Sequence, residues 1–93
     1  PAFGVYAVKV SGIGIKSYNG IANIGNRPTV NDRGELLEAN IFNFDGDLYG
    51  KEISVSLLKF IREEKKFDSI ESLKEQIIKD VYIAKNILKS YSE

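Results

Sequence analysis

The spacing of apolar residues changes once along this chain, near residue 70, and this change constrains the fold more than any other feature of the sequence. Before it, short runs rich in β-branched and aromatic residues alternate with Gly, Asn and Asp, a pattern typical of strands and turns. After it, apolar residues recur at every third or fourth position, which is the period of one helix face. They are Ile70, Leu73, Ile77, Val81, Ala84, Leu88 and Tyr91. The sequence therefore predicts a mainly β fold that ends in one helix.

Four segments before residue 70 are predicted to be strands, namely 4–10, 18–25, 36–44 and 52–60, and the second can contain a bulge. In the segment 36–44 both faces are largely apolar, as in a barrel or a sheet covered on both sides. Strands followed by one terminal helix suggest a small antiparallel β-barrel closed by that helix. The length of 93 residues, with 43% hydrophobic content, fits a single domain over 1–93.

The composition excludes several classes of function. Thirteen basic and thirteen acidic residues give a net charge of zero, which argues against nucleic acid as a partner. Cysteine and histidine are absent, so a thiolate nucleophile, a histidine base and the usual zinc ligands are excluded. No apolar run approaches the roughly 20 residues of a membrane span, and the start does not resemble a signal segment. We therefore expect a cytoplasmic protein without a membrane partner.

Glu38 is the sharpest candidate for chemistry, because it places a carboxylate inside an otherwise apolar predicted strand. A carboxylate in such surroundings can act as a general base toward a hydroxyl group. The alternative is a solvent-exposed charge on an edge strand, which is common in small β domains. The residues alone leave both interpretations open.

Two further places carry polar groups suited to a ligand. Asn26, Arg27 and Thr29 lie in a loop that offers amide, guanidinium and hydroxyl groups to a phosphate or carbonyl, although such a polar loop is usually only solvated. Arg62 either holds a ligand or pairs with a neighbouring acid at the surface, and the pattern alone favours the surface pair.

Tyr49, beside a glycine, either stacks on a flat ring or covers the end of the barrel.

The start of the predicted helix offers two possible caps. Asp68 followed by Glu71 fits a capping box, and Ser69 is the competing N-cap one residue further on. Phe67, just before them, is most simply explained as a side chain that packs at the helix entry. Capping alone explains the residue types found here.

Four segments occur in an order and at a spacing that resemble one known family: GVYAVKV, YNGIANIGNRPTV, LEANIFNFDGDLYGKEISV and FIREEKKFDSIESLKEQIIKDV. Over nearly the whole chain they resemble the riboflavin kinase module of bacterial bifunctional riboflavin kinase/FAD synthetases. The resemblance implies a six-stranded antiparallel Greek-key β-barrel with a C-terminal helix. It also implies transfer of the γ-phosphate of ATP to the 5′-hydroxyl of riboflavin, giving FMN and ADP, and an adenylyltransferase domain in the same parent chain.

The same resemblance implies a role for each matching residue. Glu38 matches the catalytic glutamate of the family, which is expected to accept the proton of the attacking hydroxyl. The residues implied on the flavin side are Arg62, Phe67, Asp68, Ile70 and Glu71. Those implied on the nucleotide side are Asn40, Phe42 and Tyr49, and Asn26, Arg27 and Thr29 match a loop near the phosphates.

One part of the family pattern is absent from these residues. Family members carry a Pro-Thr-Ala-Asn motif before the first GVYAV strand, and its Thr and Asn hold Mg²⁺ and the nucleotide phosphates. The chain begins after that point, at Pro1-Ala2-Phe3, so the first part of the barrel is expected to be missing. Mg²⁺ and ATP are expected for the full module, while this chain is expected to contain no metal ligand. The segment Pro28-Thr29-Val30-Asn31 resembles the motif only superficially and belongs to the second loop.

We expect residues 1–93 alone to have little or no kinase activity, because phosphoryl transfer depends on metal ions and donors that neutralise charge. Incubation with riboflavin and MgATP, followed by an assay for FMN, measures this, and robust turnover would contradict it. The alternative function is a non-catalytic flavin-binding module, which would bind FMN without turnover.

Overall fold

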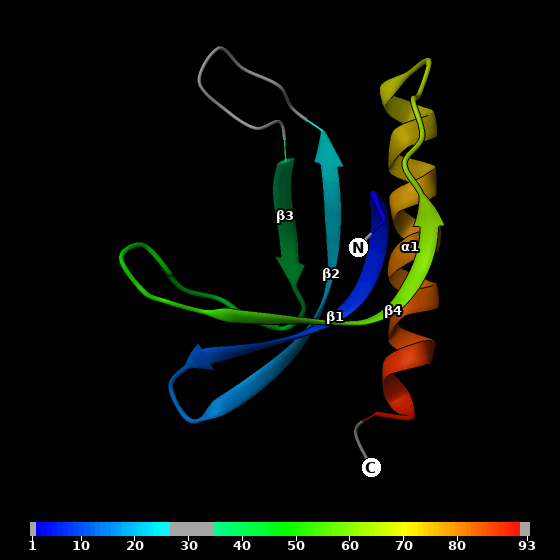
Figure 1. The fold of residues 1–93 in the computed structure, drawn as a ribbon. Coiled ribbons are helices and arrows are strands. Elements are labelled where there is room, and N and C mark those ends of the chain that lie inside the picture. Colours follow the sequence, from blue (N-terminus) through cyan, green and yellow to red (C-terminus); the bar gives the residue numbers. More distant parts are fainter. Residues whose placement is uncertain (1, 27–34, 92–93) are drawn as a thin grey trace.

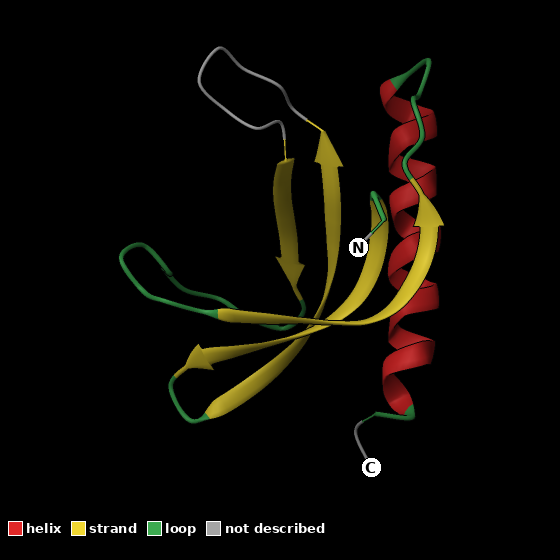
Figure 2. Ribbon diagram, in the orientation of Figure 1, coloured by secondary structure: helices red, strands yellow, loops and turns green. Residues whose placement is uncertain are grey.

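The computed structural model describes residues 2–26 and 35–91. It contains four strands, β1 (Gly4–Ile13), β2 (Lys16–Asn26), β3 (Glu35–Ile41) and β4 (Ser54–Glu63), and one helix, α1 (Ile70–Lys89). The strands form one sheet in the order β3-β2-β1-β4, and each neighbouring pair is antiparallel. The helix lies along one side of the sheet (Figure 1, Figure 2). The prediction of a mainly β fold with one C-terminal helix is confirmed.

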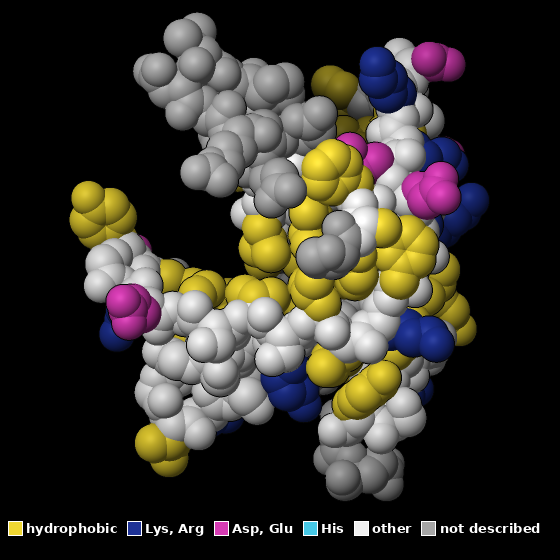
Figure 3. All heavy atoms as spheres, viewed as in Figure 1, with side chains coloured by type: hydrophobic (Ala, Val, Ile, Leu, Met, Phe, Trp, Pro, Cys, Tyr) yellow, Lys and Arg dark blue, Asp and Glu magenta, His cyan; other side chains and the backbone are white. Residues whose placement is uncertain are grey.

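The sheet does not close into a barrel within the described residues. β3 and β4 are its two edges and do not pair with each other. The sheet is nevertheless strongly curved, and the second half of β4 runs beside α1 (Figure 1). Figure 3 shows hydrophobic side chains gathered in the hollow on the side of the sheet away from α1. The expected antiparallel sheet is therefore present as an open one.

Two bulges in β4 accompany this curvature. The pairing of β1 with β4 shifts register after Val5 and again after Ala7, and each shift leaves one extra residue in β4, Ile61 and Leu58. An extra residue bends a strand and redirects its side chains. Both residues pack against the cluster of buried side chains beneath α1. The bulge that the sequence allowed in 18–25 is not there, since that segment pairs in continuous register with both neighbours.

The strand boundaries differ from those predicted. β3 ends at Ile41 rather than at residue 44, because Asn43 has a φ of 58°, a left-handed conformation that a strand does not accommodate. β1 continues to Ile13, and β4 begins at Ser54 and continues to Glu63. The predicted strands therefore exist, but the turns between them are shifted.

Both faces of β1 are buried, which explains its nearly continuous apolar sequence. On the face away from α1, the buried side chains are Tyr6, Val8, Val10 and Ala22. On the other face, Ala7 packs against Ala84 and Leu88 of the helix. The fully buried apolar contacts of α1 therefore belong to its second half.

The predicted apolar stripe of α1 is only partly buried. Ala84 and Leu88 are inaccessible to solvent, whereas Ile70 is 70% exposed and Ile77 is 44% exposed. The stripe thus changes from an open apolar surface in the first half of the helix to a packing surface in the second half. In the described part of the chain, no helix is both long and apolar enough to cross a bilayer.

Ser69 is the N-cap of α1. Its backbone is extended, and its Oγ accepts a hydrogen bond of 3.1 Å from the backbone N–H of Ser72. The competing cap is therefore the correct one, and the prediction of a capping box between Asp68 and Glu71 is wrong. Glu71 instead lies in the first turn, where its charge favours the positive end of the helix dipole.

A buried ion pair joins β4 to the middle of α1. Asp80 is 2% exposed and accepts hydrogen bonds from Nε of Arg62 at 2.9 and 3.0 Å and from Nη2 of Arg62 at 2.8 Å. Nε2 of Gln76 donates to the same carboxylate at 3.0 Å. The prediction of a surface pair with a neighbouring acid is wrong, because the partner is 18 residues away and is buried.

Ser69→Ala is expected to lower the free energy of unfolding by about 1 kcal/mol, because the N–H of Ser72 loses its acceptor. Asp68→Ala, one residue earlier, is the matched control, and its expected effect is within about 0.5 kcal/mol. Urea denaturation measures both variants. A larger loss in the Asp68 variant would contradict the assignment of the cap.

Asp80→Ala is expected to lower the free energy of unfolding by about 3 kcal/mol, because it leaves the guanidinium of Arg62 partly buried without its acceptor. Glu75→Ala, at an exposed position of the same helix, controls for loss of a carboxylate without loss of a buried pair. Chemical denaturation of both variants measures the difference. Equal stabilities would show that the ion pair does not hold α1 on the sheet.

Candidate active site

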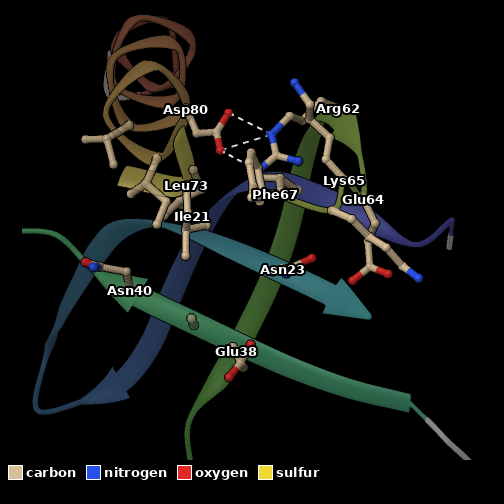
Figure 4. A pocket seen from close by; sticks show the side chains of 15 residues that line it. Ile21, Asn23, Glu38, Asn40, Arg62, Glu64, Lys65, Phe67, Leu73 and Asp80 are labelled. Atoms are coloured by element: carbon tan, nitrogen blue, oxygen red, sulfur yellow. Dashed lines mark hydrogen bonds and ion pairs between the residues drawn. The ribbon is translucent and has the colours of Figure 1, made fainter. Parts of the chain in front are cut away.

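A pocket of about 710 Å³ lies between the sheet and the first half of α1 (Figure 4). Its volume is within the range found for small-molecule sites. The strands contribute its floor, and α1 and the segment after β4 contribute its walls. The described residues that line it are Val5, Ile21, Asn23, Glu38, Ala39, Asn40, Arg62, Glu64, Lys65, Lys66, Phe67, Leu73, Ile77, Asp80 and Val81.

The four strands each place one residue in a row across the floor of this pocket. Glu38 of β3 is paired with Asn23 of β2, Asn23 with Val5 of β1, and Val5 with Arg62 of β4. Directly opposed residues of antiparallel strands point to the same face of a sheet, so the row lies on the face that carries α1. Because adjacent strands are about 4.8 Å apart, the row spans roughly 14 Å from Glu38 to Arg62.

Glu38 has features of both interpretations that the sequence left open. It is an exposed residue on an edge strand, as expected of a surface charge. Its side chain also lines the pocket, at one end of the cross-strand row (Figure 4). A ligand that enters the pocket can therefore reach this carboxylate.

The other end of the row is cationic and aromatic. Cζ of Arg62 lies 5.9 Å from the ring centroid of Phe67, and Nζ of Lys65 lies 5.8 Å from it, both within the range of cation–π contacts. Arg62 is also held by Asp80, so the guanidinium has a fixed position. Phe67 is half-buried and faces the pocket rather than serving only the helix entry. These side chains form a wall suited to a planar ring.

The structure brings together some of the residues that the resemblance implied and separates others. Glu38, Asn40, Arg62 and Phe67 line the pocket. Phe42 lies outside the lining and packs beneath the second half of α1, with Nζ of Lys85 at 5.2 Å from its ring centroid. Tyr49 is 94% exposed on the loop before β4.

The remaining implied residues lie at the ends of elements or outside the described residues. Asp68, Ile70 and Glu71 are at the start of α1, next to the wall but not among the residues that line the pocket. Asn26 ends β2. Arg27 and Thr29 lie outside the described residues.

The sequence analysis missed Asn23 and Asp80, although both carried a signal. Asn23 is two residues from Ile21 and so shares its strand face. Asp80 follows Ile77 by three positions and precedes Ala84 by four, which places it on the apolar stripe of the helix. A polar group on an apolar face requires a partner, either in the protein or in a ligand. This conflict is clear for Asp80 and weaker for Asn23, because Ser17 and Asn19 lie on the same strand face.

The described residues do not fit a divalent metal by themselves. Within 2–26 and 35–91, no group of three or more acidic side chains is close enough to hold a metal ion. Mg²⁺ prefers several oxygen ligands in near-octahedral geometry, which one carboxylate does not provide.

Comparisons with known proteins agree with the family resemblance. A family model described as "Flavokinase: Riboflavin kinase" matches residues 1–88. The chain is 46% identical over 90 residues to a bifunctional riboflavin kinase/FMN adenylyltransferase of Haemophilus influenzae, and 43% identical over 83 residues to one of Bacillus subtilis. These matches cover 97% and 86% of this chain, which spans only 29% and 26% of the length of the two relatives.

The fold is also similar to a solved structure. A crystal structure described as a macrolide-efflux protein from Streptococcus pneumoniae matches with a TM-score of 0.81 and 39% sequence identity. The match covers 92% of this chain and 28% of the other. The open sheet and its helix therefore correspond to part of a larger molecule in that structure. Because the family model spans all but the last few residues, the chain belongs to the riboflavin kinase family.

Proposed function

We propose that this chain is the riboflavin kinase domain of a longer enzyme and phosphorylates the 5′-hydroxyl of riboflavin to give FMN. The observation that carries the proposal is the placement of Glu38 and of the Arg62–Phe67 wall at opposite ends of one pocket. Riboflavin likewise has a reactive hydroxyl at one end and a planar ring at the other. The pocket offers each end a group of matching chemistry.

The flavin ring is proposed to lie between Phe67 and the apolar side chains of α1. Leu73 and Ile77 are 37% and 44% exposed, so a bound ring would cover apolar surface that the folded protein leaves open. Covering such surface contributes about 25 cal/mol per Å². Arg62 and Lys65 beside Phe67 can contact the ring or its carbonyl groups. Asp68, Ile70 and Glu71 are proposed to border the ring from the start of α1.

In the proposed reaction, the 5′-oxygen of riboflavin attacks the γ-phosphorus of ATP. The new phosphorus–oxygen bond forms as the bond to the β-phosphate oxygen breaks, and ADP leaves. Glu38 accepts the proton of the attacking hydroxyl, as a general base within reach of the pocket. Asn40, which lines the pocket on the same strand, is proposed to face the nucleotide.

We propose MgATP as the phosphoryl donor. Since the described residues form no metal site on their own, the ligands of Mg²⁺ are proposed to come from other parts of the parent protein. The relatives are named as bifunctional enzymes, and this chain spans less than a third of their length, which supports an FMN adenylyltransferase domain in the same parent protein. We place the reaction in the cytoplasm, without a nucleic acid or membrane partner.

Glu38→Gln is expected to lower kcat for FMN formation by about 100- to 10,000-fold, because the amide cannot accept the proton of the hydroxyl. Riboflavin binding, followed by quenching of flavin fluorescence, is expected to change far less. Glu75→Gln, on the exposed side of α1 and outside the pocket, is the matched control and is expected to retain full activity.

Wild-type kcat in Glu38→Gln would contradict the role of Glu38 as the base. Both measurements use the full-length parent protein, since residues 1–93 alone are expected to have little or no activity. Flavin binding without turnover by that wild-type protein would instead support the non-catalytic flavin-binding module. The two measurements together therefore distinguish an enzyme from a binding module.

A further inference from the structure

Asn23 carries a polar atom for which the described residues provide no partner. Its Oδ1 is buried and has no hydrogen-bond partner within the part of the chain that the structure describes. Buried side-chain oxygens are nearly always hydrogen-bonded, so an orphaned one in a pocket lining indicates a missing donor. Asp80 is the other polar pocket residue that was not predicted from the sequence. Its carboxylate accepts hydrogen bonds from Arg62 and Gln76. The two residues therefore have different roles.

The position of Asn23 suggests what this donor is. In the row across the floor, Asn23 is one strand from Glu38 and two strands from Arg62, and Figure 4 shows it between them. In the proposed binding mode, the terminal hydroxyl lies at Glu38 and the ring lies near Arg62 and Phe67. The chain that joins ring and terminal hydroxyl must then pass over Asn23. In riboflavin this chain carries hydroxyl groups at its 2′, 3′ and 4′ carbons.

The chemistry of an amide matches that of a hydroxyl. An uncharged amide offers an acceptor and donors, and a hydroxyl group offers both in return. Because Oδ1 makes no hydrogen bond where it lies, a ligand donor that reaches it displaces no acceptor contact within the described residues. Val5, the next residue in the row, is apolar, so the polar contact is confined to the Glu38 side of the floor.

We propose that the Asn23 amide hydrogen-bonds a secondary hydroxyl of the ribityl chain and makes the site selective for a hydroxylated tail. The inference rests on the proposed function. By holding the ribityl chain at a hydroxyl that precedes the terminal one, Asn23 directs the 5′-hydroxyl toward Glu38. A flavin whose tail lacks that hydroxyl would leave the amide unpaired again, which is the origin of the selectivity.

The test uses the full-length parent protein. It compares riboflavin with its 2′-, 3′- and 4′-deoxy analogues as substrates. For wild-type protein, one analogue is expected to lose about tenfold in kcat/KM, the cost of one unmade hydrogen bond. Asn23→Leu is expected to lose about tenfold with riboflavin and nothing further with that same analogue, because the two changes remove one contact. Asn86→Leu, an exposed position of α1 outside the pocket, is expected to match wild type throughout.

A second measurement separates this role from a structural one. Without flavin, the Tm of Asn23→Leu is expected to equal or exceed that of wild type, because an apolar group replaces a buried atom that had no partner. The inference would be overturned if Asn23→Leu had a lowered Tm and each analogue lost the same fraction of kcat/KM in the variant as in wild type. The proposed function would then remain intact. Failure of wild-type protein to phosphorylate riboflavin at all would overturn both.

Discussion

The buried pair between Arg62 and Asp80 holds the first half of α1 against the sheet. Apolar packing fixes only the second half, where Ala84 and Leu88 are fully buried. Toward the start of the helix, Ile77 is largely open, so the carboxylate of Asp80 provides the firm attachment. Since α1 forms one wall of the pocket, the shape of the site depends on this one ion pair. The same pair also fixes Arg62, which closes the cationic end of the floor.

Attachment by an ion pair leaves apolar surface available for a ligand. Leu73 and Ile77, which line the pocket, are 37% and 44% exposed, so the sheet does not fully cover this part of the helix. The Arg62–Asp80 pair joins β4 to the middle of the helix, and the two bulges in β4 accompany the curvature of that strand. The cost is the buried charge of Asp80 and the partly buried charge of Arg62, which is tolerable because Asp80 receives hydrogen bonds from both Arg62 and Gln76.

The elements of this fold could be predicted because their signals are local. Alternation marks the strands, and the three-to-four spacing after Ile70 marks the helix. What could not be predicted depends on residues far apart in the sequence. The partner of Arg62 is 18 positions away, and the register that aligns Glu38 with Asn23 and Val5 is set by two separate strand pairings. Even the choice between Asp68 and Ser69 as the cap depended on where the chain turns into the helix.

Conflicts between a residue type and its surroundings were the most useful guide to the site. Glu38, Asn23 and Asp80 are polar residues that each follow an apolar residue on the same face, namely Leu36, Ile21 and Ile77, and such departures from a consistent pattern are expected at functional or strained sites. Their hydrogen-bond partners in the structure distinguish Asp80 from Asn23. Asp80 is satisfied by the protein and therefore serves the architecture, whereas the oxygen of Asn23 has no donor among the described residues. An unpartnered buried oxygen destabilises a protein, so the amide of Asn23 is consistent with the proposed contact to a group that arrives with the ligand.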